Sequence, residues 1–396
     1  MVKFINLRVF KDFFQSSTAG GFILIACLVI SLLIANSPLG AGFENFLTQE
    51  VGYQSESLFL RYSVLLWIND GLMAIFFLLV GLEIKRELVE GELSTFKKAS
   101  LPAFAAIGGM VVPALFYALF NSGTPTANGW GIPMATDIAF AIAVLSILGN
   151  RVPVSLKVFL TALAIVDDLG AILVIAIFYS TELHLDYLLY AAGIFFLLIA
   201  FNLFGVKSII MYLVPGVFMW YFIHHSGVHA TVAGVLTALT LPTTPDAKES
   251  PLEKLEHGLI KPVNFLIMPI FALANTNIRF ESGMVEGLTS NLGLGIIVGL
   301  LLGKPLGITL MSWLSVKSGA SILPVGIKWK QIIGAGLLAG IGFTMSIFIT
   351  LLSFPELEFQ TEAKFSILVT SMLAGLLGYI FLHKVGKKIY PDPLTT

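Results

Sequence analysis

The sequence contains little charge. Only 12% of its 396 residues are Asp, Glu, Lys or Arg, whereas an ordinary soluble domain contains about 25%. A single cysteine, Cys27, excludes an intrachain disulfide bond. The sequence also shows no nucleic-acid-binding signal and no soluble catalytic domain, and its net charge of −1 points to no charged partner. These shortages exclude an ordinary soluble enzyme and leave a chain built mainly from apolar residues.

Hydrophobic residues make up 57% of the chain, and its mean hydropathy is +0.91. Runs of about 20 apolar residues recur along the whole length, and each is long enough to cross the hydrocarbon core of a bilayer. Only α-helices and closed β-barrels can do this, and barrel strands would alternate polar with apolar residues. The first run lacks a convincing signal-peptide cleavage site. The sequence therefore predicts an all-α polytopic membrane protein without a cleaved leader.

We expect about 12 transmembrane helices. Of the 23 Lys and Arg residues, 19 fall in alternate segments on one side; only Arg61, Arg279 and Lys364 fall on the other, and Lys304 lies within a span. Because basic residues collect in cytoplasmic segments, this asymmetry predicts both termini in the cytoplasm. The predicted spans are 18–36, 62–82, 101–120, 125–148, 154–178, 186–204, 208–222, 227–241, 259–275, 292–315, 330–353 and 363–384.

The chain is expected to form one integral membrane domain over residues 1–396. It would have a cytoplasmic N-terminus at 1–17, a periplasmic loop at 37–61 and a cytoplasmic tail at 385–396. The stretch FLTQEVGYQSESLFL in the loop has modest strand character. We expect residues 42–61 to form a hairpin through which two copies of the chain make a homodimer.

Two spans carry interruptions. In the fourth, Pro133 removes a backbone donor, and Thr136 and Asp137 favour the start of a new half-helix. In the eleventh, GAGLLAGIGFTMSIFI clusters glycines with Thr344 at a similar depth, for which ordinary glycine packing is the alternative. The two spans run in opposite directions, and such a pair is typical of inverted-repeat transporters with a midplane site. We therefore predict inverted-topology repeats formed by spans 3–5 and 10–12.

Asp167 and Asp168 are adjacent in the apolar run VFLTALAIVDDLGAILVIAIFY. Each carboxylate costs roughly 2.5–3.5 kcal/mol to place at mid-bilayer, and two neighbouring charges of one sign cost more. At a helical rise of about 1.5 Å per residue, Asp137 and Lys304 lie about 18 Å into their spans and Asp168 about 22 Å. The four ionisable groups therefore fall near one level. A structural salt bridge is the alternative to a binding site.

Carboxylate oxygens suit hard cations such as Na⁺ and Li⁺. Neighbouring buried carboxylates also resist full ionisation, so the same oxygens would hold either protons or a cation. Asp167 and Asp168 point about 100° apart on a helix, and at most one faces squarely into a given cleft. Asp137 would compensate the positive end of a half-helix dipole. Lys304 would face the half-helix C-termini or pair with one of the two adjacent aspartates.

Other titratable residues lie near the ends of spans. Asp70 lies near the start of the second span and His229 begins the eighth, and for each a structural role is the alternative. The end of the second span and the head of the ninth would form a titratable cytoplasmic patch, although ordinary solvated helix ends are the alternative. The patch consists of Glu83, Arg86, Glu87, Lys254, Glu256 and His257, in which Arg86 can pair with Glu83 or Glu87.

Several stretches together resemble the NhaA-type sodium–proton antiporters of bacterial inner membranes. They are LLWINDGLMAIFFLLVGLEIKREL, ATDIAFAIAVL, LAIVDDLGAI, SGVHATVAG, GLLLGKPLGI and GIGFTMSIF, and the resemblance extends from about residue 15 to 385. The most specific element is ATDIAFA followed by AIVDDLGA at this spacing. Inverted repeats and broken helices are known in this family, and the two interrupted spans of this chain fit that pattern.

The resemblance implies a secondary antiporter, not an enzyme, that exports Na⁺ or Li⁺ against a larger number of protons. Exchange would be electrogenic and pH-regulated, with alternating access to a midplane site. The resemblance implies no cofactor, and Na⁺, Li⁺, H⁺ and the lipid bilayer are the expected partners. Asp167 and Asp168 would carry the ions, and the titratable patch would take part in pH activation. The supporting residues would be Asp137, Thr136, Lys304, Asp70 and Thr344.

The start of the ninth span departs from the family pattern. It reads SPLEKLEHGLIKP, with Glu253 where a basic residue is expected and Ile260 where histidine is expected. The residues of the transport core match the pattern. The departures therefore concern the pH dependence and leave the transport chemistry as it is.

Three other classes fit parts of the pattern. A cation channel would need a continuous polar pore, whereas this chain offers a buried charged cluster. An intramembrane prenyltransferase would need a DDxxD-like repeat near a surface with basic phosphate ligands, and DDLGA is single and deep. An intramembrane aspartyl protease needs aspartates on two facing helices, which Asp137 and Asp167 formally supply. Gain of peptide cleavage with loss of transport would favour the protease.

Overall fold

The structure is a computed structural model that describes residues 7–55, 59–180, 183–243, 250–281 and 283–386. The predicted N-terminal segment and C-terminal tail lie partly outside the described residues. The chain divides into two compact units: unit 1 comprises 1–22, 92–171 and 282–396, and unit 2 comprises 23–91 and 172–281. Two of the four boundaries fall inside helices, one in α1 (Leu7–Ala35) and one in α7 (Val154–Phe178). That the chain forms a single domain over 1–396 stays a prediction.

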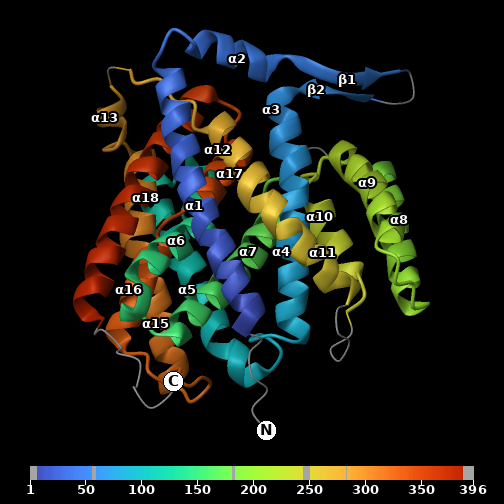
Figure 1. Ribbon diagram of the computed structural model, residues 1–396. Coiled ribbons are helices and arrows are strands. Elements are labelled where there is room, and N and C mark those ends of the chain that lie inside the picture. Colours follow the sequence, from blue (N-terminus) through green and yellow to red (C-terminus); the bar gives the residue numbers. More distant parts are fainter. Residues whose placement is uncertain (1–6, 56–58, 181–182, 244–249, 282, 387–396) are drawn as a thin grey trace. The chain divides into compact units, whose positions relative to one another are not determined.

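Unit 1 contains the second predicted repeat and the first repeat up to residue 171 of α7. In it, α15 packs along α5 and α16 packs against α18 (Figure 1). The first repeat consists of α5 (Phe96–Asn121), the 3₁₀ helix η2 (Ala127–Met134), α6 (Ile138–Leu148), the 3₁₀ turn η3 (Gly149–Arg151) and α7. The second consists of α14 (Asn291–Val298), the π-helical turn η5 (Gly299–Gly303), α15 (Lys304–Lys317), α16 (Trp329–Ala339), α17 (Phe343–Ser353) and α18 (Leu357–Val385). The short helix α13 (Met284–Gly287) precedes it.

Both predicted interruptions are present in unit 1. The chain leaves helical conformation at residues 135–137, between η2 and α6, directly after Pro133. Helices α16 and α17 meet at an angle of 49° across residues 340–342, where two of the three residues are glycine. Each repeat therefore holds one span whose backbone hydrogen bonding stops and restarts inside the protein.

Unit 2 combines a β-hairpin with helices. Strands β1 (Glu50–Gln54) and β2 (Phe59–Ser63) pair antiparallel, so the loop predicted at 42–61 does contain strands, with residues 56–58 outside the described part. A buried cluster that includes Leu82, Tyr212 and Met219 joins the helices, and α8 lies beside α9 (Figure 1). The helices are α2 (Gly40–Thr48), α3 (Val64–Leu66), η1 (Trp67–Leu72), α4 (Met73–Val89), α8 (Leu185–Leu203), α9 (Ile210–His225), α10 (Val232–Thr240), α11 (Pro251–Pro262), η4 (Val263–Ile267) and α12 (Met268–Asn275).

The expected all-α polytopic fold is confirmed, with differences in the spans. Among the described residues, eight helices are long and apolar enough to cross a membrane, or up to ten if each of two bent pairs counts as one. The predicted seventh and eighth spans correspond to α9 and α10, which have only 16 and 9 residues. The predicted ninth span began at 259, but its helix begins at Pro251, because Ser250 and Glu253 form a capping box there.

Glycine allows α5 and α15 to approach closely. A Cβ added at Gly108 would lie 2.1 Å from the carbonyl oxygen of Gly307, and a Cβ at Gly307 would lie 2.0 Å from that of Gly108. Small residues at a helix crossing allow such backbone contact inside a membrane, where packing drives helix association. Because α15 begins at Lys304, this contact sets where the buried lysine lies relative to α5.

We predict that Gly108→Ala destabilises the protein by about 1–3 kcal/mol, because the added methyl group meets a backbone atom that cannot turn aside. Gly193→Ala is the matched control, since a Cβ at Gly193 in α8 meets no atom within 4 Å. Thermal unfolding in detergent measures both. Equal midpoints for the two variants would contradict the close contact.

Candidate functional site

Asp137 joins the starts of the two restarted half-helices. It is the N-cap of α6, where its Oδ1 accepts a hydrogen bond from the backbone N of Phe140 at 3.0 Å. Its Oδ2 accepts from both the backbone N of Thr344 at 3.1 Å and the Thr344 hydroxyl at 2.6 Å. One buried carboxylate thus satisfies free N–H groups of α6 and of α17 and lies at the positive end of both dipoles.

On the other side of each break, where a helix ends, a hydroxyl group lies close to a free backbone carbonyl oxygen. Ser346 of α17 donates to the carbonyl oxygen of Ile132 in η2 at 2.7 Å. Thr136 lies within donating distance of the carbonyl oxygen of Ala339, the last residue of α16, at 2.9 Å. Each interrupted span therefore offers a side-chain hydroxyl to the terminal carbonyls of the other. Sequence reasoning missed Ser346, because a serine in an apolar span has no distinguishing pattern.

Lys304 pairs with Asp167. Its side chain is completely buried, and Nζ forms a short ion pair with Asp167 Oδ2. Nζ also donates to the Thr136 hydroxyl at 3.0 Å, and that hydroxyl lies 2.7 Å from Asp167 Oδ2. Of the two arrangements left open by the sequence, the structure has the ion pair. The pairing offsets part of the desolvation cost of both charges.

The second oxygen of Asp167 is available to bind a ligand or a proton. Asp167 Oδ1 is buried and has no hydrogen-bond partner among the described residues. Asp168, next in the chain, is 3% exposed and close enough to Lys304 to interact with its charge. Carboxylate oxygens without donors are ligands for a hard cation or acceptors for a proton. The described residues contain no group of three or more His, Cys, Asp or Glu arranged to hold a metal.

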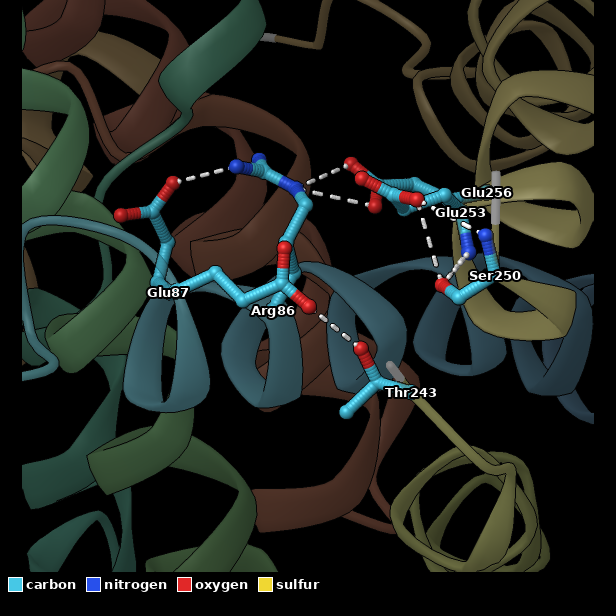
Figure 2. A network of polar contacts seen from close by, with 7 residues as sticks. Arg86, Glu87, Thr243, Ser250, Glu253 and Glu256 are labelled. Carbon is cyan, nitrogen blue, oxygen red and sulfur yellow. Dashed lines mark hydrogen bonds and ion pairs between the residues drawn. The ribbon is translucent and has the colours of Figure 1, made fainter. Parts of the chain in front are cut away.

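In unit 2, Arg86 connects α4 to α11. Its Nη1 lies 2.7 Å from Glu87 Oε1, and its Nε lies 3.0 Å from Glu256 Oε1, as Figure 2 shows. Glu256 is 2% exposed, and Glu83 is also buried one turn before Glu87. Three carboxylates thus gather around one guanidinium. Lys254 and His257, from the same predicted patch, are exposed on α11.

Glu253 caps a helix. Its Oε2 accepts from the backbone N of Ser250 at 2.9 Å, while its own N donates to the Ser250 hydroxyl at 3.3 Å (Figure 2). Nearby, the Thr243 hydroxyl donates to Glu90 Oε1 at 2.7 Å. The residue that departs from the family pattern therefore stabilises the first turn of α11.

Asp70 lies in the π-helical turn η1, next to α9. Its Oδ2 is 3.1 Å from His224 Nδ1, and the Trp220 indole N–H donates to its backbone oxygen at 3.3 Å. Trp220 and His224 stack with ring centroids 5.7 Å apart. Sequence reasoning named Asp70 but missed His224, for which the doubled histidine before SGVHATVAG was the available signal.

Two further histidines of unit 2 make separate contacts. His229 Nε2 lies 2.8 Å from the carbonyl oxygen of Tyr179. His225 Nε2 lies 3.3 Å from the Tyr62 hydroxyl of strand β2. Burial raises the pKa of Tyr62 to about 12, with smaller contributions from the charges of Tyr221 and Asp70. The Tyr62 hydroxyl also donates a hydrogen bond to the carbonyl oxygen of Phe59 at 3.0 Å.

The predicted site residues form two groups. Unit 2 holds Asp70, His229 and the whole titratable patch. Unit 1 holds one connected polar cluster made of Thr136, Asp137, Asp167, Lys304 and Thr344, with Asp168 beside it.

Comparison with known proteins gives one consistent result. The family model described as Na⁺/H⁺ antiporter 1 matches residues 11–382. A curated relative from Flavobacterium johnsoniae, Na(+)/H(+) antiporter NhaA 2, is 64% identical over 388 residues, which cover 98% of this chain and 95% of the relative. The Na(+)/H(+) antiporters NhaA of Flavobacterium psychrophilum and Yersinia enterocolitica are 52% and 51% identical, covering 96% and 95% of this chain and 97% of each relative.

We predict that Lys304→Ala destabilises the protein by about 3 kcal/mol or more, because it leaves Asp167 buried without its counter-charge. The double variant Lys304→Ala/Asp167→Ala should recover part of that loss, since it leaves no unpaired charge. Unfolding in detergent micelles measures both free energies. A double variant less stable than Lys304→Ala would contradict the ion pair.

Proposed function

The chain belongs to the Na⁺/H⁺ antiporter 1 family, and from this premise we propose that it exchanges Na⁺ for protons across a bacterial inner membrane. One observation carries the proposal: among the described residues no donor contacts Asp167 Oδ1, whereas Lys304 and Thr136 contact Oδ2. Asp168 is the next residue in the chain and carries a second carboxylate. The two carboxylates supply the hard oxygen ligands that Na⁺ and Li⁺ require.

Exchange results from competition for the same oxygens. A carboxylate that binds a proton loses its negative charge and is a poor cation ligand, so the site holds protons or the cation. A bound cation also weakens the attraction between Asp167 and Lys304, because it places a second positive charge on the same carboxylate. When more than one proton enters for each cation that leaves, the cycle moves net charge, and we propose this electrogenic form.

Alternating access uses the interrupted spans. Around the breaks, hydrogen bonds to the Asp137 carboxylate and from the hydroxyls of Thr136 and Ser346 replace the backbone hydrogen bonds of a continuous helix. Side-chain bonds can be exchanged without unwinding a helix, so the half-helices can shift while their ends stay satisfied. The site at their crossing would then open to one side of the membrane at a time.

The remaining features of the proposal follow from the sequence. The distribution of basic residues supports both termini in the cytoplasm. Li⁺ is proposed as a second substrate because it offers the same hard charge. The exposed strand β1, with a free edge next to its single partner β2, supports a homodimer through residues 42–61. The carboxylates around Arg86 are proposed to take part in pH activation.

We predict that Asp167→Asn and Asp168→Asn each reduce exchange to the level of protein-free liposomes, because an amide cannot release a proton or match a carboxylate as a cation ligand. The measurement is Na⁺- or Li⁺-driven alkalinisation inside proteoliposomes that hold an acid interior. Asp186→Asn is the control, since Asp186 is exposed at the start of α8. Full activity in both site variants would overturn the carboxylate mechanism.

We predict that Arg86→Gln moves the pH of half-maximal exchange toward alkaline values by about 1 unit. The guanidinium favours the ionised forms of the carboxylates it contacts, so without it their protons leave only at higher pH. Activation that accompanies this deprotonation shifts in the same direction. Arg61→Gln is the control, because Arg61 pairs with Glu50 on the exposed hairpin. Superimposable pH profiles for Arg86→Gln and the unsubstituted protein would remove the patch from pH activation.

A further inference from the structure

The start of α17 is held by two side chains from two different elements. The backbone N of Phe343, the first residue of the helix, donates to the hydroxyl of Ser371 at 3.1 Å. The next backbone N, that of Thr344, donates to Asp137 at 3.1 Å. Ser371 belongs to α18 and is 3% exposed. Free N–H groups at a helix start need acceptors when water is excluded. The acceptor for the Phe343 N–H comes from α18, which lies outside the two interrupted spans.

The same helix start is linked to the buried ion pair. Thr344 is bonded to Asp137 through both its backbone and its hydroxyl. Asp137 follows Thr136 in the chain, and the Thr136 hydroxyl contacts Asp167 and Lys304. The position of the first turn of α17 therefore determines where Asp137 lies, and Asp137 determines where Thr136 meets the carboxylate.

We propose that Ser371 is a positioning residue of the exchange site, acting on Asp167 through α17, Asp137 and Thr136. The inference rests on the proposed exchange function. Ser371 acts on the carboxylates indirectly, by accepting the hydrogen bond from the Phe343 N–H. The Asp137 carboxylate then keeps its hydrogen bonds with Thr344 and Phe140. Without it, the Phe343 N–H loses its acceptor next to Thr344, whose backbone and hydroxyl supply two of the three hydrogen bonds that the Asp137 carboxylate receives.

Packing supports this role for α18. A Cβ on Gly375, one turn after Ser371, would lie 3.5 Å from the side chain of Ile341 in the break. The α18 backbone thus lies against the break itself, and the Ser371 hydroxyl reaches the adjacent helix start. A shift of α18 would move both contacts together.

The same helix provides a matched control. Ser366 is completely buried, and its hydroxyl has no hydrogen-bond partner among the described residues. Ser366→Ala therefore removes a hydroxyl of the same size from the same helix without freeing any donor. Ser371→Thr is the conservative variant, since threonine keeps an oxygen at the same position.

The first experiment measures cation-driven proton flux in proteoliposomes as a function of Na⁺ concentration. Because the geometry of the ion ligands changes, Ser371→Ala should raise the apparent KM for Na⁺ roughly fivefold or more, with a smaller change in kcat. Ser366→Ala should leave KM unchanged, and Ser371→Thr should restore most of it. Hydrogen–deuterium exchange of peptides spanning residues 340–350 should increase in Ser371→Ala and not in Ser366→Ala.

The outcomes separate this inference from the function on which it rests. Equal KM values for Ser371→Ala and Ser366→Ala, in a protein that exchanges Na⁺, overturn the role of Ser371 and leave the proposed function standing. Faster hydrogen–deuterium exchange with unchanged kinetics assigns Ser371 a structural role only and also overturns it. Absence of exchange in the unsubstituted protein overturns the proposed function and, with it, the positioning role.

Discussion

Two chain breaks inside an apolar protein impose the constraint on which the rest of unit 1 depends. Each break leaves backbone N–H and C=O groups without helical partners, and no water at membrane depth can satisfy them. Asp137 accepts hydrogen bonds from backbone N–H groups at the starts of both restarted helices. The hydroxyls of Thr136 and Ser346 lie within donating distance of carbonyl oxygens where the preceding helices end. Polar residues that are costly in a bilayer are therefore required at this crossing, and the ion pair lies directly beside them.

The four charged residues at the crossing of the interrupted spans in unit 1 divide into two sets with different roles. Asp137 lies at two helix N-termini, which together carry roughly one positive charge and balance its carboxylate. Asp167, Asp168 and Lys304 remain, and when all three are ionised they carry one net negative charge. One bound cation neutralises that set, and the two carboxylates together can take up two protons, which is the larger number of protons that the proposed electrogenic exchange requires. A buried site with a single uncompensated negative charge prefers to be occupied, which makes exchange between two kinds of occupant its natural chemistry.

Charged site residues can be identified from the sequence because their burial in a membrane is costly. Small polar site residues cannot, because their burial is common. Asp137, Asp167, Asp168 and Lys304 stand out in apolar runs because charge at that depth is rare. Serines occur throughout the spans, so nothing in the sequence marks Ser346 as a carbonyl partner of Ile132. The all-α fold and both breaks follow from hydropathy, proline and glycine. Helix ends such as Pro251 were misplaced because a capping box can form among charged residues that hydropathy treats as loop.

The structure of unit 2 explains one departure of the ninth span from the family pattern. Glu253 replaces an expected basic residue, and its carboxylate is bonded to the backbone N of Ser250 at the start of α11. A carboxylate in that position also favours the helix dipole, whereas a basic residue would oppose it. Arg86 contacts Glu87 and Glu256, and His257 adds a second basic group near Glu256. The carboxylates of Glu83 and Glu256 are buried and that of Glu87 is partly buried, so protonation of the cluster responds to burial as well as to the charge of Arg86.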